Sequence, residues 1–151
     1  MSDEDQRFLE VAVEEARAGL REGGIPIGAA LVLDGRVLGT GRNRRVQQGS
    51  SIRHGEMDAL ENTGRRPAST YARATLYTTL SPCHMCTGAI LLYGIRRVVI
   101  GEHKTFLGPE DLLRQHGVEL VLADNAECLA LMTRFIQQNP TLWNEDIGQG
   151  S

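Results

Sequence analysis

The chain has 151 residues and a formal net charge of −3. That length is usual for one domain, so we expect a single domain over residues 1–151 with a core of its own. The acidic balance and the lack of basic tracts argue against a nucleic-acid partner, and no apolar run is long enough to cross a membrane. With no recognisable secretion signal, we expect the protein in the cytoplasm.

Residues 3–24 predict an amphipathic helix. Acidic residues come early, apolar residues recur near one face, and the pattern stops at Gly23-Gly24. The face that we expect to be buried is formed by Phe8, Ala12, Ala16 and Leu20.

A hairpin and a second helix are expected next. Asp34-Gly35 separates two short apolar runs within residues 28–43, which is typical of a tight turn between strands. Residues 50–65 then predict a helix that has Met57 and Leu60 at an apolar helical spacing.

The second half of the chain alternates between strand and helix. Residues 74–80 are rich in Thr, Leu and Tyr and predict a strand, and residues 83–93 predict a helix that ends at a glycine. Later strands are expected at 96–102 and 118–124, and later helices at 108–117 and 125–140. Five strands interleaved with about five helices predict an α/β fold, in which helices cover one mixed sheet that begins with a hairpin and continues with crossovers.

Two cysteines lie three residues apart where the strand at 74–80 leads into the helix at 83–93. Cys83 and Cys86 are about 60° apart around a helix axis, so both sulfurs can reach one ion. An odd number of cysteines without a secretion signal argues against disulfides, and thiolates together with an imidazole suit zinc. His54 is the best candidate for the third ligand. These three ligands leave a fourth position for water, as in a catalytic zinc site.

Glu56 follows His54 by two residues and is the candidate base for that water. Two thiolates and a neutral imidazole cancel the charge of the ion, so a nearby base would help to activate water at neutral pH. Because residues two apart diverge by about 200° on a helix, we expect His54 at the helix cap and Glu56 in the first turn. We also expect the two helices to direct their N-termini at the ion from adjacent strands.

The remaining cysteine and histidines are expected to have other roles. Cys128 lies among apolar residues of the last helix and is expected in the core. His84 is offset by about 100° from Cys83 and is expected to face the surface or an interface. His103 and His116 lie near the ends of elements, where we expect solvent-exposed or hydrogen-bonded side chains.

His54-x-Glu56 followed by Pro82-Cys83-x-x-Cys86 resembles the signature of the zinc-dependent cytidine and deoxycytidylate deaminase superfamily. Five segments are similar to fungal-type cytosine deaminases, over residues from about 8 to 148: "EGGIPIGAAL", "GRNRR", "HGEMDALENTGR", "TLYTTLSPCHMCTGAILLYGI" and "WNEDIG". The resemblance implies a three-layer sandwich with a central mixed five-stranded sheet between helices. It also implies a homodimer with one zinc ion per subunit.

The resemblance further implies roles for individual residues and a reaction. His54, Cys83 and Cys86 would bind zinc, and Glu56 would move protons. The implied base contacts are Asn43 and the Gly55 backbone at the carbonyl edge, Asp146 and the Ser81 carbonyl at the amine, and Phe106, Trp143 and Ile147 over the ring. The implied reaction is hydrolytic deamination of a free nucleobase, cytosine to uracil plus ammonia, in pyrimidine salvage.

Several alternatives stay open at this point. Without the resemblance, Asn43 could cap a turn, Trp143 could anchor the C-terminal segment, and Asp146 could be a solvated acid. Isocytosine, a creatinine-like heterocycle or a purine base would suit the same zinc centre, and His84 and the segment 103–117 depart from the fungal pattern. A tRNA adenosine deaminase shares the signature but needs a cationic docking face. A zinc-stabilised binding module would need a fourth protein ligand.

Overall fold

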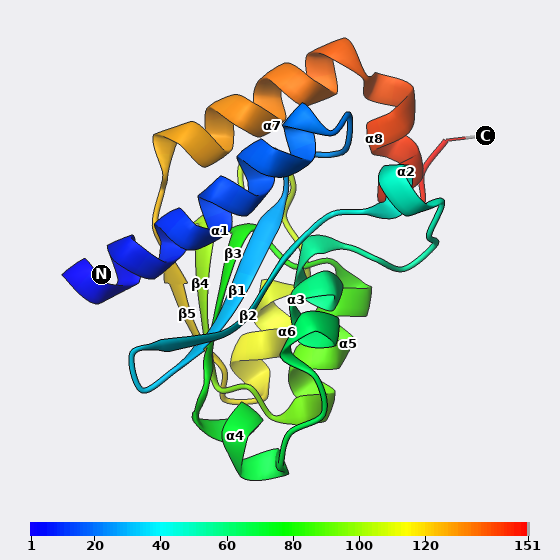
Figure 1. Ribbon diagram of the computed structural model, residues 1–151. Coiled ribbons are helices and arrows are strands. Elements are labelled where there is room, and N and C mark those ends of the chain that lie inside the picture. Colours follow the sequence, from blue (N-terminus) through cyan, green and yellow to red (C-terminus); the bar gives the residue numbers. More distant parts are fainter. Residues whose placement is uncertain (151) are drawn as a thin grey trace.

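The computed structural model describes residues 1–150 and has a five-stranded sheet at its centre (Figure 1). β1 runs antiparallel to both of its neighbours, whereas β3, β4 and β5 are parallel to one another. In the order β2-β1-β3-β4-β5, the strands are β1 (Gly28–Leu33), β2 (Arg36–Arg42), β3 (Thr75–Leu80), β4 (Arg97–Glu102) and β5 (Glu119–Leu122). The predicted mixed sheet, with a hairpin first and crossovers later, is confirmed.

Helices cover both faces of this sheet (Figure 1). The four longer helices are α1 (Asp3–Arg21), α3 (Gly55–Thr63), α5 (His84–Tyr93) and α7 (Ala126–Gln138). The four shorter ones are α2 (Arg45–Gln48), α4 (Ala68–Arg73), α6 (Glu110–Gln115) and α8 (Pro140–Asp146). The sequence patterns predicted about five helices and missed α2, α4 and α8, because these are too short to show a helical period.

The side chains of β1 contribute to the core on both faces of the sheet, because successive side chains of a strand point to opposite sides. Ala30 and Val32 pack with Phe8 and other apolar residues of α1. Ala29 and Leu31 pack on the opposite face, in a cluster that includes Ala59 of α3, Tyr71 of α4, Ile90 of α5 and Leu113 of α6. The three-layer sandwich is therefore confirmed.

The first helix largely follows its predicted pattern. Its N-terminus has a capping box between Ser2 and Asp5, and Phe8, Ala12 and Ala16 are buried as expected. Leu20 is 41% exposed, so its predicted burial is wrong. The neighbouring Gly19 is buried instead, because the Ile25 carbonyl and the Arg42 side chain lie against it.

The contact between α3 and β2 is unusually close. A Cβ atom built on Gly41 of β2 would lie 2.2 Å from the backbone nitrogen of Ala59 in α3. The side of α3 that is buried includes Glu56 and Asp58, whereas Met57 and Leu60 are only half-buried. Leu60 still packs against the core, and Glu56 and Asp58 are the acidic residues that this helix turns inward.

Among the described residues, no helix combines the length and the apolar character needed to cross a bilayer.

Candidate active site

His54 and Cys83 occupy equivalent positions at the starts of two helices. His54 is the N-cap of α3 and Cys83 is the N-cap of α5, so the positions predicted for His54 and Glu56 are found. The two helices follow β2 and β3, which are separated by β1, so the expectation of adjacent strands is wrong. The chain that leaves β2 is held beside β1 by a hydrogen bond from the Asn43 N–H to the Ile27 carbonyl, at 2.9 Å.

The donor atoms of His54, Cys83 and Cys86 lie within 4.8 Å of one another. His54 Nδ1 is 3.4 Å from Cys83 Sγ and 3.8 Å from Cys86 Sγ. A tetrahedral zinc ion requires about 3.6 Å between a nitrogen ligand and a sulfur ligand. The spacing and the donor set therefore fit one zinc ion. No fourth His, Cys, Asp or Glu in residues 1–150 belongs to this group, so three protein ligands would hold the ion.

The other ring nitrogen of His54 faces Asp146. Nε2 is 3.2 Å from the Asp146 backbone carbonyl and 3.5 Å from its carboxylate oxygen Oδ2. Metal-binding histidines commonly donate their second ring N–H to such groups, which fixes the tautomer and the orientation of the ring. Asp146 therefore orients His54 so that Nδ1 faces the two sulfurs.

The protonation of the three donors is strongly coupled. The pKa of Cys83 is lowered to about 4, chiefly by its hydrogen bond with Cys86 and also by His54, against the effect of burial. The same bond, together with burial, raises the pKa of Cys86 well above its usual value. Burial lowers the pKa of His54, but Asp146 and Cys83 raise it to about 10. Because a metal ligand must be deprotonated, zinc binding to this group would be coupled to release of protons.

Glu56 lies in the first turn of α3 and is 4% exposed. Burial is the main cause that raises its pKa to about 7, and the charge of Cys83 adds to the effect. Its side chain lines the same cavity as His54 and Cys83. A carboxyl group in this position can exchange a proton with water or with a bound molecule.

The cavity beside these groups is small, about 20 Å³, which is room for a water molecule. Two aromatic side chains line it, Phe106 and Trp143, and their ring centroids are 6.1 Å apart at an interplanar angle of 86°. The residues that line it are Ile27, His54, Glu56, Leu80, Ser81, Cys83, Phe106, Trp143, Asp146 and Ile147. The expected ring contacts Phe106, Trp143 and Ile147 thus come together with Glu56, Ser81 and Asp146.

Asn43 and Asp146 form a buried polar pair behind the cavity. Asn43 Nδ2 is 3.2 Å from both carboxylate oxygens of Asp146, and Asn43 Oδ1 accepts the Arg45 N–H at 3.0 Å. Arg45 Nη1 donates to Asp146 Oδ1 at 3.0 Å. Burial opposes ionisation of Asp146, but hydrogen bonds from His54, Asn43 and Arg45 lower its pKa. Asp146 is 5% exposed, so it is not a solvated terminal acid.

The sequence analysis missed Asp58, which organises the segment that leads into α3. Its side chain is fully buried and accepts hydrogen bonds from the Arg42 N–H and from Arg44 Nε, each at 2.9 Å, and from Arg53 Nε. The signal in the sequence was an acidic residue four positions after His54, preceded by a cluster of arginines. Asp58 holds both ends of the connection between β2 and α3.

The other predicted residues lie around the site or away from it. Gly55 begins α3 and is buried against Ile27, but it does not line the cavity. His84 is exposed, and Cys128 is 1% exposed in the core, both as expected. His103 is paired with Glu110. His116 Nδ1 lies 3.0 Å from the Leu112 carbonyl on the exposed side of α6.

Comparison with known proteins identifies the family. Residues 2–102 match the model of the cytidine and deoxycytidylate deaminase zinc-binding region. The chain belongs to this family. All three members of the zinc-binding group, and Glu56 with them, fall within the matched residues.

Two relatives within this family differ in what their names state. The chain is 55% identical to the cytosine deaminase of Candida albicans over 150 residues, which are 99% of this chain and 100% of the relative. It is 33% identical to a tRNA-specific adenosine deaminase of Streptococcus pyogenes serotype M18 over 148 residues, with 90% of this chain and 92% of the relative covered.

Solved structures agree with the fold. A chain from a study of tRNA:A34 deaminases superposes with a TM-score of 0.72 at 29% identity and covers 83% of this chain and 99% of its own. The guanine deaminase of Nitrosomonas europaea gives a TM-score of 0.72 at 23% identity and covers 89% of this chain and 84% of its own. The second likeness concerns the fold alone.

Proposed function

We propose that this protein is a zinc-dependent cytosine deaminase that converts cytosine and water into uracil and ammonia. The observation that carries the proposal is the 55% identity to a cytosine deaminase over 99% of the chain. The rings of Phe106 and Trp143 beside His54, Cys83 and Glu56 support it, because aromatic side chains can pack on a free pyrimidine ring and exclude water from it.

His54, Cys83 and Cys86 would hold the metal, one ion per chain. When bound, zinc supplies the Lewis acidity that makes water a nucleophile near neutral pH. Glu56 would take the proton of the attacking water and deliver it to the ring nitrogen beside the amine-bearing carbon. Glu56 would then take the remaining proton of the added hydroxyl group and give it to the amine, so that the C–N bond breaks, ammonia leaves and a carbonyl remains.

The residues around Glu56 would orient the base. Asn43 has a second amide N–H besides the one directed at Asp146, and we assign it to the pyrimidine carbonyl together with the Gly55 backbone. Asp146 and the Ser81 carbonyl would face the amine. Phe106, Trp143 and Ile147 would cover the ring, and they must move outward to admit it, because the cavity measures only about 20 Å³.

A tRNA adenosine deaminase is the second candidate, because one such enzyme is 33% identical over 90% of this chain. The net charge of −3 and the cover of Phe106 and Trp143 over the cavity favour a free base instead. Isocytosine, creatinine and the purine bases would react at the same zinc centre, and comparing their rates of ammonia release with that of cytosine distinguishes these substrates.

Ammonia release from a panel of substrates tests the proposal. The zinc-loaded protein is assayed with cytosine, isocytosine, creatinine, adenine, guanine and a tRNA anticodon stem-loop, and zinc is quantified in the same samples. We expect the highest kcat/KM with cytosine and loss of turnover after chelation. Faster release from any other substrate would refute cytosine, and full zinc content without any ammonia would support a binding module.

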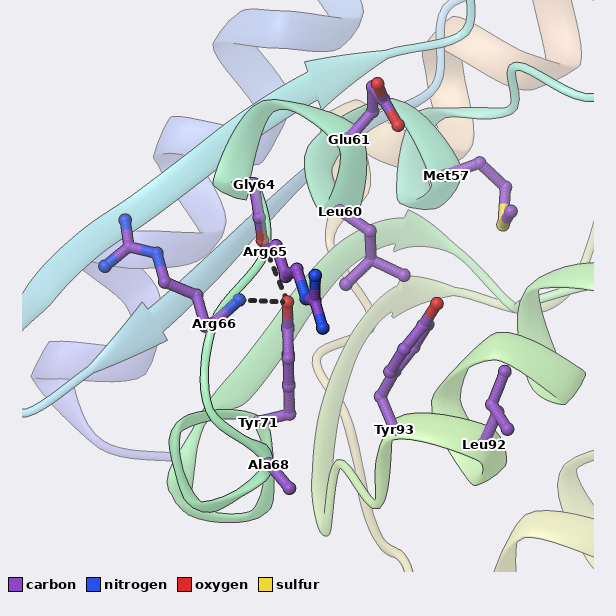
Figure 2. A pocket seen from close by; sticks show the side chains of 10 residues that line it. All are labelled: Met57, Leu60, Glu61, Gly64, Arg65, Arg66, Ala68, Tyr71, Leu92 and Tyr93. Carbon is purple, nitrogen blue, oxygen red and sulfur yellow. Dashed lines mark hydrogen bonds between the residues drawn. The ribbon is translucent and has the colours of Figure 1, made fainter.

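We further propose that the protein is a homodimer in the cytoplasm, where thiol ligands stay reduced. α5 is apolar almost all round, a composition typical of a buried helix, yet Leu92 is 75% exposed and Tyr93 is 44% exposed. Both residues border a hollow of about 690 Å³ between α3, α4 and α5, shown in Figure 2. A second copy of the chain would cover this apolar surface.

A further inference from the structure

Two buried carboxylates hold the loop of residues 103–109, which places Phe106 at the cavity. Glu102 ends β4 and is 1% exposed, and its carboxylate accepts the backbone N–H groups of Lys104 at 2.8 Å and of Thr105 at 3.0 Å. Glu110 begins α6 and is 5% exposed. The proposed chemistry uses neither of them.

The side chain of Ser81 is directed at Glu110 rather than at a substrate. Its hydroxyl donates to Glu110 Oε2 at 2.7 Å and accepts the Gly108 N–H at 2.9 Å. The only proton that this hydroxyl can donate is therefore committed within the protein. The proposed contact with the amine therefore uses the Ser81 carbonyl and not the Ser81 side chain.

The same loop also packs against the residue that precedes the start of α5. A Cβ atom built on Gly108 would be 1.7 Å from the carbonyl oxygen of Pro82, a distance that no side chain tolerates. Pro82 precedes Cys83, which is the N-cap of α5. Residues 103–109, which we call the Phe106 loop, therefore meet Ser81 and the segment that leads into Cys83 at one point.

Glu110 has partners on the loop and on its own helix in addition to Ser81. His103 Nδ1 of the loop is 3.1 Å from Oε2, and Arg114 Nη2 of α6 is 3.4 Å from Oε1. Together with the Ser81 hydroxyl, these groups compensate a carboxylate that would otherwise be costly to bury. One side chain thus joins the end of β3, the Phe106 loop and α6.

We propose that Glu110 is a positioning residue whose carboxylate clamps the Phe106 loop to Ser81 and thereby sets the width of the cavity. The inference rests on the proposed deaminase function, in which Ser81 and Phe106 contact the base. Glu110 touches neither the zinc donors nor Glu56, so its removal loosens base binding and leaves the chemical step nearly unchanged.

The test compares Glu110→Ala and Ser81→Ala with the matched control Asp111→Ala, in zinc-loaded protein. Asp111 is the next residue of α6, and its side chain is 91% exposed and pairs with Arg114 at the surface. Zinc content and thermal unfolding identify variants that fail to fold. Trp143 is the only tryptophan and packs edge-on against Phe106, so quenching of its fluorescence by acrylamide reports movement of the loop without any turnover.

We expect Glu110→Ala and Ser81→Ala to raise KM for cytosine about tenfold, with kcat within about threefold of wild type, and to increase quenching. A wider cavity also discriminates less, so the preference for cytosine over 5-methylcytosine should shrink in both variants. The double variant should lose less affinity than the sum of the two single variants, because both remove the hydrogen bond between Ser81 and Glu110.

The clamp would be overturned if the kinetics and the quenching of Glu110→Ala matched those of Asp111→Ala. It would also be overturned if Glu110→Ala showed increased quenching but an unchanged KM and unchanged selectivity. If zinc-loaded wild type releases no ammonia from cytosine while quenching still separates Glu110→Ala from Asp111→Ala, the proposed function fails and the clamp stands. Should Glu110→Ala not fold, Ser81→Ala and Glu110→Gln decide the matter. Glu110→Gln can still accept the Ser81 hydroxyl, so it should restore most of the affinity.

Discussion

Gly41→Ala tests whether the close contact between β2 and α3 positions the catalytic groups. The added Cβ would lie 2.2 Å from the Ala59 nitrogen, 2.6 Å from the Asp58 carbonyl carbon and 2.8 Å from the Ala59 Cα atom. All three are backbone atoms, so no side-chain rotation relieves the overlap. Ordinary contacts begin near 3.4 Å, and α3 must therefore retreat from β2 by about 1 Å.

This shift reaches the site because α3 carries Glu56 and begins at His54, whereas Cys83 and Cys86 belong to α5. A retreat of α3 changes the distances between His54 Nδ1 and both sulfurs and moves Glu56 relative to the cavity. A misplacement of about 1 Å can lower the rate about 100-fold. Overpacking of this kind also costs about 1–3 kcal/mol of stability. We therefore expect kcat/KM for cytosine to fall about 100-fold, with weaker zinc binding and a lower Tm.

Gly88→Ala is the matched control. Gly88 is exposed in α5, two residues after Cys86, and no atom lies within 4 Å of a Cβ built on it. Alanine is favoured over glycine in a helix by about 1 kcal/mol, so this variant should keep its kinetics and should be as stable as wild type or more so. Ammonia release, zinc content and thermal unfolding are measured on both variants. Gly41→Ala with full zinc content and kcat/KM within about threefold of wild type would refute the reasoning.

Three further predictions follow from other parts of the structure. Glu56→Gln should retain one zinc per chain, since Glu56 is not a ligand, while kcat/KM falls about 10²–10⁴-fold; near-normal turnover in a steady-state assay would remove its role in proton transfer. The Arg97 guanidinium lowers the pKa of the Asp5 carboxyl below the unfolded value of about 3.9, so their pairing stabilises the fold above about pH 4 and is lost in acid. Asp5→Asn should therefore lower the free energy of unfolding by about 1–3 kcal/mol at pH 7 and by less at pH 3; denaturant titrations that give the same difference at both pH values would contradict this. Leu92→Lys should shift the protein from dimer to monomer in light scattering while the zinc content is unchanged, and a variant that is still dimeric would move the interface away from α5.

The local features of the site could be predicted because they depend on residues near one another in the chain. Because each helical residue turns by about 100°, His54 and Glu56 cannot lie on the same face of a helix. For both to face one site, His54 had to lie at the cap. The same argument put Cys83 and Cys86 on one side of a helix start. Both expectations agree with the N-cap positions of α3 and α5.

Other features depend on packing, and the sequence patterns predicted them wrongly or not at all. The apolar spacing of Met57 and Leu60 predicted a helix but did not show that Glu56 and Asp58 are buried in it. Asp58 is buried where it accepts three hydrogen bonds, and Glu56 is buried at the cavity. The two helices were expected on adjacent strands, but β1 separates β2 from β3. Strand order is set by pairing between distant segments, and local periodicity does not report it.

The sequence by itself determined the α/β class, the proposed zinc donor set and the position of Glu56, because each follows from helical or strand periodicity and from the ligand preferences of zinc. Only the tertiary structure decided that Asn43 and Asp146, 103 residues apart, share hydrogen bonds, and that Glu110 meets Ser81 across 29 residues. Such contacts form when remote segments pack on the same end of the sheet. Their physical cause is the burial of polar groups that must find partners, and the identity of those partners depends on the whole fold.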